Sequence, residues 1–250
     1  MNKIEFFDCE ASFGLRGYKR EHMPTTKEEM RSRFDRYGID SALMRYEFAN
    51  NGVTLEGNFE LCDVIKNDER LLPMWYVLPH YTGEFPEPSE LIKLMKENNV
   101  RAVSLQSEGW TVGEWTCGEL FNTLEKHKIP VLVPIARIPN TYAGLYEILK
   151  NHKDLRVILT GVGYTAMRDI YPLLSTFPNL YISTATYKAY EGVEVTVEKF
   201  GAERLIFGSG MPELSGAASV ALITYARISR EDKEKIASGN LKKLLSEVEF

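Results

Sequence analysis

Two carboxylates and a histidine follow apolar runs of the sequence, and side chains of this kind can exchange protons with a ligand. Glu10, His80 and Glu108 each come at or just after the end of a predicted strand. Partial burial raises the pKa of a carboxyl group into a range useful for general acid–base catalysis, whereas a neighbouring arginine lowers it. We therefore interpret these three residues as candidate catalytic groups. The alternative for the two carboxylates is a plain ion pair with an arginine at the surface.

Arginine, aromatic and hydroxyl side chains occur at neighbouring strand ends. Arg45 and Arg137 each stand where a predicted strand ends, and a guanidinium group can bind a carboxylate or phosphate through two parallel hydrogen bonds. The other candidate substrate-binding residues are Trp110, Tyr164 and Ser209. Together these residues favour a small, polar, anionic molecule as the ligand, and a carboxylated one in particular.

The other potentially reactive side chains have ordinary structural explanations. His127 and His152 lie at predicted helix ends, where the helix dipole favours a cation. The three cysteines are far apart and form no paired motif, which is typical of a protein from a reducing compartment. The sequence has no Gly-x-Gly-x-x-Gly or Walker-type loop, so we predict no organic cofactor.

Eight apolar runs alternate with amphipathic segments, and these elements must position the candidate residues. The predicted strands are Ile4–Phe7, Ser41–Phe48, Leu71–Leu78, Arg101–Gln106, Pro130–Ala136, Arg156–Thr160, Leu180–Ser183 and Arg204–Phe207. Strict alternation of strand and helix over 250 residues predicts a closed α/β fold, the (β/α)8 TIM barrel, with a doubly wound open sheet as the alternative. In such a barrel the carboxyl ends of the strands form one mouth, where the candidate residues would meet.

Capping residues mark several of the helix boundaries. Thr26 and Glu29 form a capping box for a helix that stops at Gly38, and Ser89 is expected to cap a helix that reaches Asn98. The remaining predicted helices are Leu55–Lys66, Gly118–Lys128, Thr141–Asn151, Ala166–Thr176, Val193–Phe200, Ala217–Arg227 and Ser229–Leu245. No linker or change of composition interrupts this pattern, so we predict a single domain over residues 1–250.

Charge and hydropathy exclude two broad classes of partner. The net charge is −5, and basic and acidic residues are interspersed, which argues against a nucleic-acid or anionic-membrane surface. No stretch approaches the length and hydropathy of a membrane span. We therefore expect a cytoplasmic protein whose partner is a small molecule.

Five stretches form an ordered set along the chain. They are Asp8–Gly14, Ile129–Pro134, Asp154–Gly163, Arg204–Pro212 and Glu234–Leu244. Together they resemble the amidohydrolase-related barrels, a family of metal-dependent hydrolases and decarboxylases. The first stretch is similar to the family's Asp-x-His-x-His-x-Gly, and the fourth to Arg-x-x-Phe-Gly-Ser-Asp-x-Pro. The resemblance covers nearly the whole chain and implies a TIM barrel like that of the metal-dependent hydrolases, of a kind that often pairs as a homodimer.

The chain departs from this family at the metal-binding positions. In the family, two opening histidines, the histidines ending strands five and six and the aspartate after strand eight carry the metal and its activated water. Here these positions hold Glu10, Ser12, Pro134, Gly161 and Gly210. Proline and glycine offer no side-chain donor, whereas a catalytic zinc takes three protein ligands and keeps one position open. We therefore predict that the family's metal centre is absent and assign no metal ligand.

The sequence leaves three functions open. The first is an amidohydrolase-like hydrolase or lyase that acts on a small carboxylated molecule without the usual metal. The second is a catalytically inactive barrel that serves as a ligand-binding or assembly protein. The third is an orthodox metallohydrolase with replacement ligands drawn from Asp8, Cys9, Glu10 and His80, which we disfavour because strands five, six and eight offer nothing to complete the shell.

Overall fold

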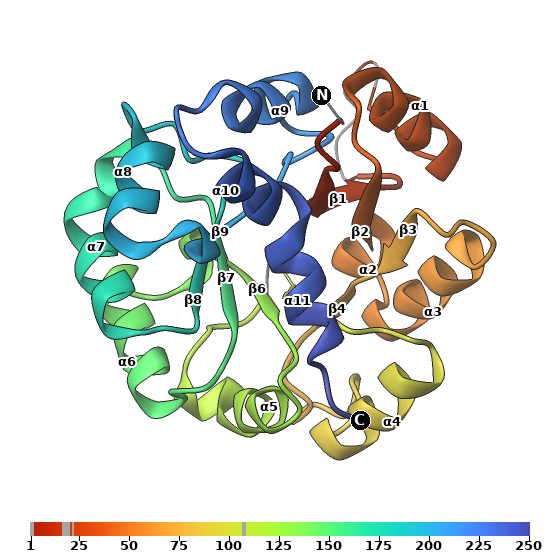
Figure 1. The fold of residues 1–250 in the computed structure, drawn as a ribbon. Coiled ribbons are helices and arrows are strands. Elements are labelled where there is room, and N and C mark those ends of the chain that lie inside the picture. The colour runs from red at the N-terminus through yellow and green to blue at the C-terminus, as the bar shows by residue number, and fades with distance from the viewer. Residues whose placement is uncertain (1–2, 17–20, 22, 107–108) are drawn as a thin grey trace.

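The strands of the computed structural model, which describes residues 3–16, 21, 23–106 and 109–250, form a parallel barrel surrounded by helices (Figure 1). The strands are β1 (Phe7–Phe13), β2 (Ser41–Tyr46), β3 (Leu71–Pro73), β4 (Trp75–Val77), β5 (Val103–Leu105), β6 (Val131–Pro134), β7 (Val157–Thr160), β8 (Leu180–Ser183) and β9 (Leu205–Ile206). The hydrogen-bonded neighbours among the described strands run parallel to each other. β3 and β4 are two halves of one barrel segment, because only Met74 separates them and its amide donates to the Met44 carbonyl at 2.9 Å.

The barrel closes where the first strand meets the last. The Cys9 amide donates to the Phe207 carbonyl at 2.9 Å, and the Ser12 amide donates to the Met211 carbonyl at 3.0 Å. With β3 and β4 counted as one segment, the strands of the described chain occupy the eight positions of a TIM barrel. The predicted fold is therefore confirmed, and the open-sheet alternative is wrong.

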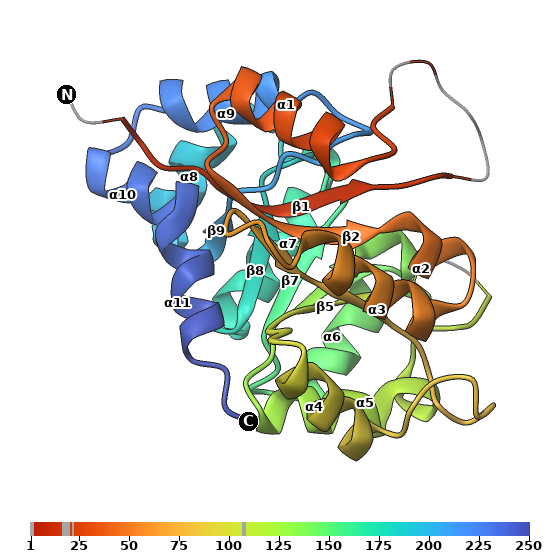
Figure 2. The same cartoon turned by 90° about the vertical axis from the view of Figure 1, so that its right-hand side faces the viewer.

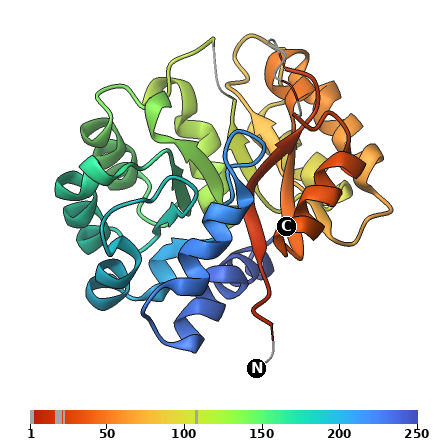
Figure 3. The ribbon, with the colours of Figure 1, turned by 90° about the horizontal axis from the view of Figure 1, so that it is seen from above.

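Helices cover the outside of the barrel, as the view from above shows (Figure 3). The α-helices are α1 (Lys27–Tyr37), α2 (Glu47–Asn51), α3 (Thr54–Ile65), α4 (Pro88–Glu97), α5 (Glu114–Lys126), α6 (Tyr142–Asn151), α7 (Met167–Thr176), α8 (Gly192–Phe200), α9 (Gly216–Tyr225), α10 (Arg230–Glu234) and α11 (Asn240–Ser246). Short turns of tighter or wider helix are η1 (Ile135–Arg137), η2 (Tyr164–Ala166), η3 (Ala202–Arg204) and η4 (Lys235–Gly239). Among the described residues, no helix has both the length and the apolar character that crossing a bilayer requires.

The helix caps agree with the sequence in one case and correct it in another. At α1 the Thr26 side chain accepts from the Glu29 amide, the Glu29 carboxylate accepts from the Thr26 amide, and Gly38 ends the helix at φ 76°. At α4 the predicted cap, Ser89, is wrong, because the helix begins earlier with Pro88 at its first position. Proline is favoured there because it has no amide proton to leave unpaired and its φ is already helical.

The extent of β1 is the largest correction to the predicted elements. The sequence predicted a strand over Ile4–Phe7 and a loop after it, whereas β1 starts at Phe7 and continues to Phe13 (Figure 2). The strand pairs with β2 on both sides of an irregularity between Asp8 and Ala11. A bulge of this kind re-aims side chains near the end of a strand, and Glu10 lies within it. Glu10 is thus part of a strand and not of a loop.

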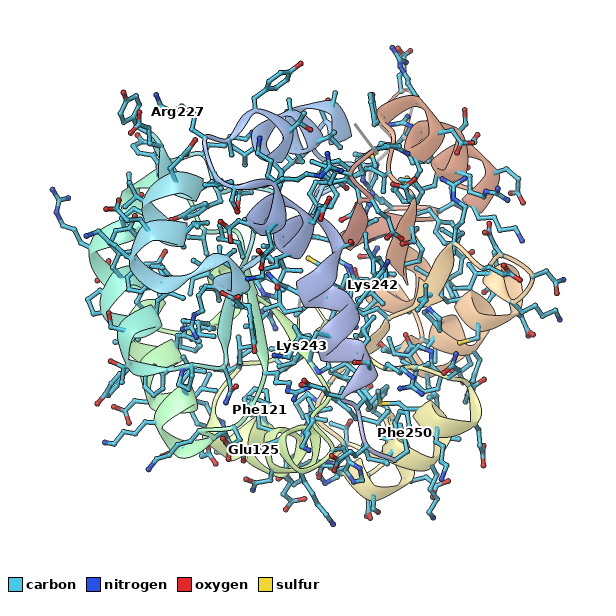
Figure 4. All side chains as sticks on the ribbon, viewed as in Figure 1. Phe121, Glu125, Arg227, Lys242, Lys243 and Phe250 are labelled. Atoms are coloured by element: carbon cyan, nitrogen blue, oxygen red, sulfur yellow. The ribbon has the colours of Figure 1, made fainter. Side chains whose placement is uncertain are left out.

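A helix near the carboxyl terminus closes the opposite end of the barrel. Figure 1 shows α11 lying across the strands, and its Leu241, Leu244 and Leu245 share one buried cluster with strand residues such as Phe7 and Leu43. The spacing of these leucines is that of an apolar helix stripe. On the same helix Lys242 and Lys243 are exposed (Figure 4). The interior is therefore apolar at this end, and the carboxyl ends of the strands form the other end of the barrel, which is called the mouth below.

The predicted helix Ser229–Leu245 contains a turn of π-helix, η4. Ser229 caps the first turn, α10, as expected, because its side chain accepts from the Asp232 amide at 3.0 Å. The Ile236 carbonyl in η4 accepts from the Phe207 amide at 3.0 Å. Asn240 follows η4, and its buried side-chain amide donates to the carbonyls of Ala202 and Leu205 at 2.8 and 2.9 Å. These bonds attach the terminal helix to the last strand.

Replacing Asn240 by alanine tests this attachment. The change removes two buried hydrogen bonds, although the Ala202 carbonyl keeps the Leu205 amide as a donor, so we expect Asn240→Ala to lower the free energy of unfolding by about 2 kcal/mol. Urea unfolding followed by circular dichroism measures the loss. Asn122→Ala on the exposed side of α5 is the matched control and should change little. Equal losses in the two variants would contradict this role for Asn240.

Candidate functional site

Glu10 from β1 and Ser183 from β8 meet at the floor of the mouth. The Ser183 hydroxyl donates to Oε2 of Glu10 at 2.5 Å. Gly208, just after β9, lies against both side chains: a Cβ atom there would be 2.2 Å from the Ser183 Oγ and 3.3 Å from the Glu10 Oε2. The missing side chain at position 208 therefore provides the space in which this hydrogen bond forms.

Arg45 reaches the same region from β2 and has few partners. Its Nη1 lies 3.5 Å from the Ser104 Oγ, and its guanidinium carbon lies 5.7 Å from the centre of the Tyr76 ring. Its Nε is buried and has no hydrogen-bond partner among the described residues. A guanidinium group carries five N–H donors, and the one side-chain hydrogen bond to a described residue uses only Nη1.

Burial sets the electrostatics of the site. Desolvation raises the pKa of Glu10, and the nearby charge of Arg45 and the Ser183 hydrogen bond only partly oppose it. Burial likewise raises the pKa of Asp8. Burial by itself would lower the pKa of Arg45, but its neighbours, Tyr76 and Glu10 foremost, produce a net rise. The site thus combines a carboxyl group that tends to retain its proton with a guanidinium ion that retains its charge.

Asp8 and Ser209 form a buried connection beneath this site. Both carboxylate oxygens of Asp8 are used: one accepts from the amides of Ser209 and Glu10 at 2.9 Å each, and the other accepts from the Ser209 hydroxyl in a very short contact. Ser209 is fully buried. In this structure its hydroxyl therefore joins the loop after β9 to β1, and contact of Ser209 with a ligand stays a prediction.

A second charged cluster lies beside the site, and Arg16 within it was missed by the sequence analysis. Arg16 donates to the Ser12 Oγ at 2.8 Å and pairs with the buried Glu47 carboxylate at 2.8 Å. Glu47 also accepts from the Tyr76 hydroxyl at 3.5 Å. This cluster extends to the ring over which Arg45 lies. The residues are distant in sequence, and no short motif connects them.

Arg137, predicted to bind an anion, instead holds the loop after β5. Its Nε donates to the Gln106 carbonyl at 3.2 Å and its Nη2 to the Trp110 carbonyl at 2.8 Å. Its guanidinium carbon lies 5.3 Å from the centre of the Trp110 ring. Arg137 and Trp110 are therefore brought together as a unit. Glu108, the other candidate in the loop after β5, lies outside the described residues.

His80 and Tyr164 have neighbours other than Glu10 and Arg45. The Nε2 of His80 lies 3.4 Å from the Glu119 carboxylate on α5, and its ring packs on Tyr81. Tyr164 in η2 is 71% exposed. Within the described part of the chain, no hydrogen bond or ion pair joins either residue to Glu10 or Arg45. Of the predicted site residues, the structure thus brings Glu10 and Arg45 into one electrostatic unit.

The donors at the family's metal positions do not fit a divalent-metal shell. Pro134 ends β6, while Gly161 and Gly210 follow β7 and β9 and have no side chain to offer. The two remaining positions face cations, because Ser12 accepts from Arg16 and the charge of Arg45 acts on Glu10. In the described part of the chain, no three His, Cys, Asp or Glu side chains gather as a group that could hold a metal.

Comparison with known proteins identifies the family. The sequence matches the amidohydrolase family over residues 63–246. The chain belongs to the amidohydrolase family. No curated protein matches the sequence.

Several solved structures have the same fold as this chain. An uncharacterised TIM-barrel protein from Bordetella bronchiseptica is 17% identical, with a TM-score of 0.76 over 97% of this chain and 99% of that one. A 5-carboxyvanillate decarboxylase from Novosphingobium aromaticivorans, solved with manganese, is 14% identical with a TM-score of 0.77 over 97% of both chains. A 2,6-dihydroxybenzoate decarboxylase from Rhizobium is 14% identical with a TM-score of 0.73 over 98% and 99%. At such low identity these likenesses establish the TIM-barrel fold.

The close approach at Gly208 can be tested with two substitutions. Gly208→Ala would place a methyl group within 2.2 Å of the Ser183 Oγ, so we expect the free energy of unfolding to fall by about 2 kcal/mol. Adding Ser183→Ala removes that oxygen, and the double variant should lose less than the sum of the two single losses. Urea unfolding of all three variants gives the coupling. Strict additivity would show that Ser183 and residue 208 do not press on each other.

Proposed function

We propose that this member of the amidohydrolase family is a hydrolase or lyase that acts on a small carboxylated molecule without the family's usual metal centre. The observation that carries the proposal is the proximity, at the barrel mouth, of a sparsely bonded guanidinium group and a carboxyl group whose burial raises its pKa. Arg45 binds the carboxylate of the ligand, and Glu10 gives or takes a proton.

Arg45 suits this binding role because it has few hydrogen bonds to the described residues and lies on a strand paired on both sides. The residue lies on β2, a strand held on both sides by its neighbours, and its guanidinium lies over the Tyr76 ring. Hydrogen bonds between a guanidinium and a carboxylate are charge-assisted and are often bidentate. Rigid placement of such donors means that little entropy is lost when the ligand binds.

Glu10 suits the proton-transfer role because its surroundings favour the protonated form more than water does. A group with a raised pKa can act as a general acid closer to neutral pH. In a decarboxylation, the electron pair of the broken carbon–carbon bond stays on the ligand carbon, carbon dioxide leaves, and a proton completes the product. Two of the similar structures are named as decarboxylases of carboxylated aromatic molecules, which supports this ligand class.

The other predicted site residues keep secondary parts in this proposal. His80 and Glu108 remain alternative acid–base groups, while Arg137 and Trp110 shape the loop after β5 and Tyr164 offers an exposed ring above β7. A catalytically inactive, ligand-binding barrel is the second candidate, and it is favoured by the same feature, the sparsely bonded Arg45. Binding of carboxylates without turnover would select this second candidate.

Anion binding by Arg45 can be measured with sodium benzoate as the probe. We expect benzoate to bind the wild-type protein. Arg45→Gln should weaken the affinity by about tenfold or more, because hydrogen bonds between charged groups are lost. Arg45→Lys keeps the charge but not the bidentate geometry and should fall between the two. Isothermal titration calorimetry gives the dissociation constants. Arg36→Gln on α1 is the exposed control, and equal affinity of Arg45→Gln and wild type would refute the assignment.

The proposed metal independence is tested by metal analysis and chelation. We expect purified protein to contain far less than one transition-metal ion per chain. Dialysis against a chelator should leave unchanged both the Tm and any release of carbon dioxide from 2,6-dihydroxybenzoate or 5-carboxyvanillate. Adding manganese should then restore nothing, because nothing was removed. Stoichiometric, tightly held metal, or a Tm that drops on chelation and recovers with manganese, would overturn this part of the proposal.

A further inference from the structure

The two oxygens of the Glu10 carboxyl group have different surroundings. Oε2 accepts from the Ser183 hydroxyl at 2.5 Å and lies against Gly208. No hydrogen bond from the described residues reaches Oε1, and Glu10 is only partly buried. Oε1 is therefore the oxygen that a ligand in the mouth can reach.

We propose that Ser183 is a positioning residue that gives the two oxygens of Glu10 separate roles: Oε2 is held by the serine, and Oε1 exchanges the proton with the ligand. This inference rests on the proposed function and extends it by naming the atom that transfers the proton and the residue that selects it. Ser183 itself is 1% exposed and so does not touch the ligand.

The Ser183 hydroxyl has a second contact besides Glu10. The amide of Ala185 donates to the Ser183 Oγ at 3.4 Å and occupies one of its two lone pairs. The Ser183 hydroxyl proton is donated to Oε2 of Glu10. A hydroxyl group that donates in this way stabilises the carboxylate that remains after proton transfer, and it keeps Oε2 occupied throughout.

The proton balance is complete with these groups alone. The proton leaves Oε1 for the ligand atom that has gained the electron pair of the broken bond. Glu10 remains as a carboxylate, which the Ser183 hydroxyl and the charge of Arg45 stabilise, and water returns a proton to Oε1 after product leaves. The other ionisable groups that act on this unit are Asp8 and Cys9 on β1 and, beyond Arg45, Tyr76 and Glu47.

The test is a titration of the Glu10 carboxyl group by carbon-13 NMR, with Glu10→Gln used to assign the signal. The Ser183 hydrogen bond lowers the pKa of Glu10, so removing it in Ser183→Ala should move the titration midpoint to higher pH. Ser183→Cys has a weaker donor and similar size, should shift the midpoint in the same direction, and decides the matter if the alanine variant does not fold. Ser219→Ala, another buried serine, should leave the midpoint unchanged.

Benzoate binding supplies a second readout that a purely structural role of Ser183 would not move. An ionised Glu10 repels the benzoate carboxylate, so affinity should be highest between the pKa of benzoic acid and the raised pKa of Glu10, and should fall as pH rises through the latter. In Ser183→Ala that fall should occur at higher pH, in step with the NMR midpoint. The same midpoint in wild type, Ser183→Ala and Ser183→Cys would overturn the inference. Absence of benzoate binding at every pH would refute the proposed function, while the NMR titration would still judge Ser183.

Discussion

The hydrogen bond between the Cys9 amide and the Phe207 carbonyl is the constraint on which the rest of the molecule depends. It joins β1 to β9 and turns a sheet with two free edges into a barrel. Glu10 and Ser183 are 173 residues apart, and they meet because this closure places β1 beside the last two strands. The buried contact between Asp8 and Ser209 strengthens the same junction. The candidate site thus lies at the seam of the barrel, the junction where β1 meets β8 and β9.

The position of the site at this seam also explains why the pKa of Glu10 is raised. Below Glu10 the interior is filled by apolar side chains, including Cys9 and the leucines of α11. These side chains have no need of a hydrogen-bond partner. A carboxyl group above such a floor loses part of its hydration, which raises its pKa. Asn240 and the π-turn before it hold that floor against β9. The electrostatics of the mouth therefore depend on packing at the far end of the barrel.

Local patterns in the sequence sufficed for the fold but not for the site. Strand β8 was predicted with its observed bounds, and the Thr26–Glu29 capping box was confirmed, because both are encoded within a few residues. The extent of β1 was missed because Asp8, Glu10 and Ser12 read as a polar loop, although polar and apolar residues alternate there as in a strand. The Arg16–Glu47 pair depends on how the segment after β1 meets the start of α2, which no short-range pattern reveals.

The nature of the positive charge bears on which reaction the mouth can support. A metal ion both binds an anion and lowers the pKa of a bound water, so it can produce a nucleophile for hydrolysis. A guanidinium ion such as Arg45 binds a carboxylate but has no open coordination position to activate water. If the positive charge is supplied by arginine, as proposed, hydrolysis would need a deprotonated side chain to activate water as a general base, a role that the raised pKa of Glu10 disfavours, while a decarboxylation needs an anchored carboxylate and a proton from Glu10. The arrangement of donors therefore favours the lyase over the hydrolase among the two reactions proposed.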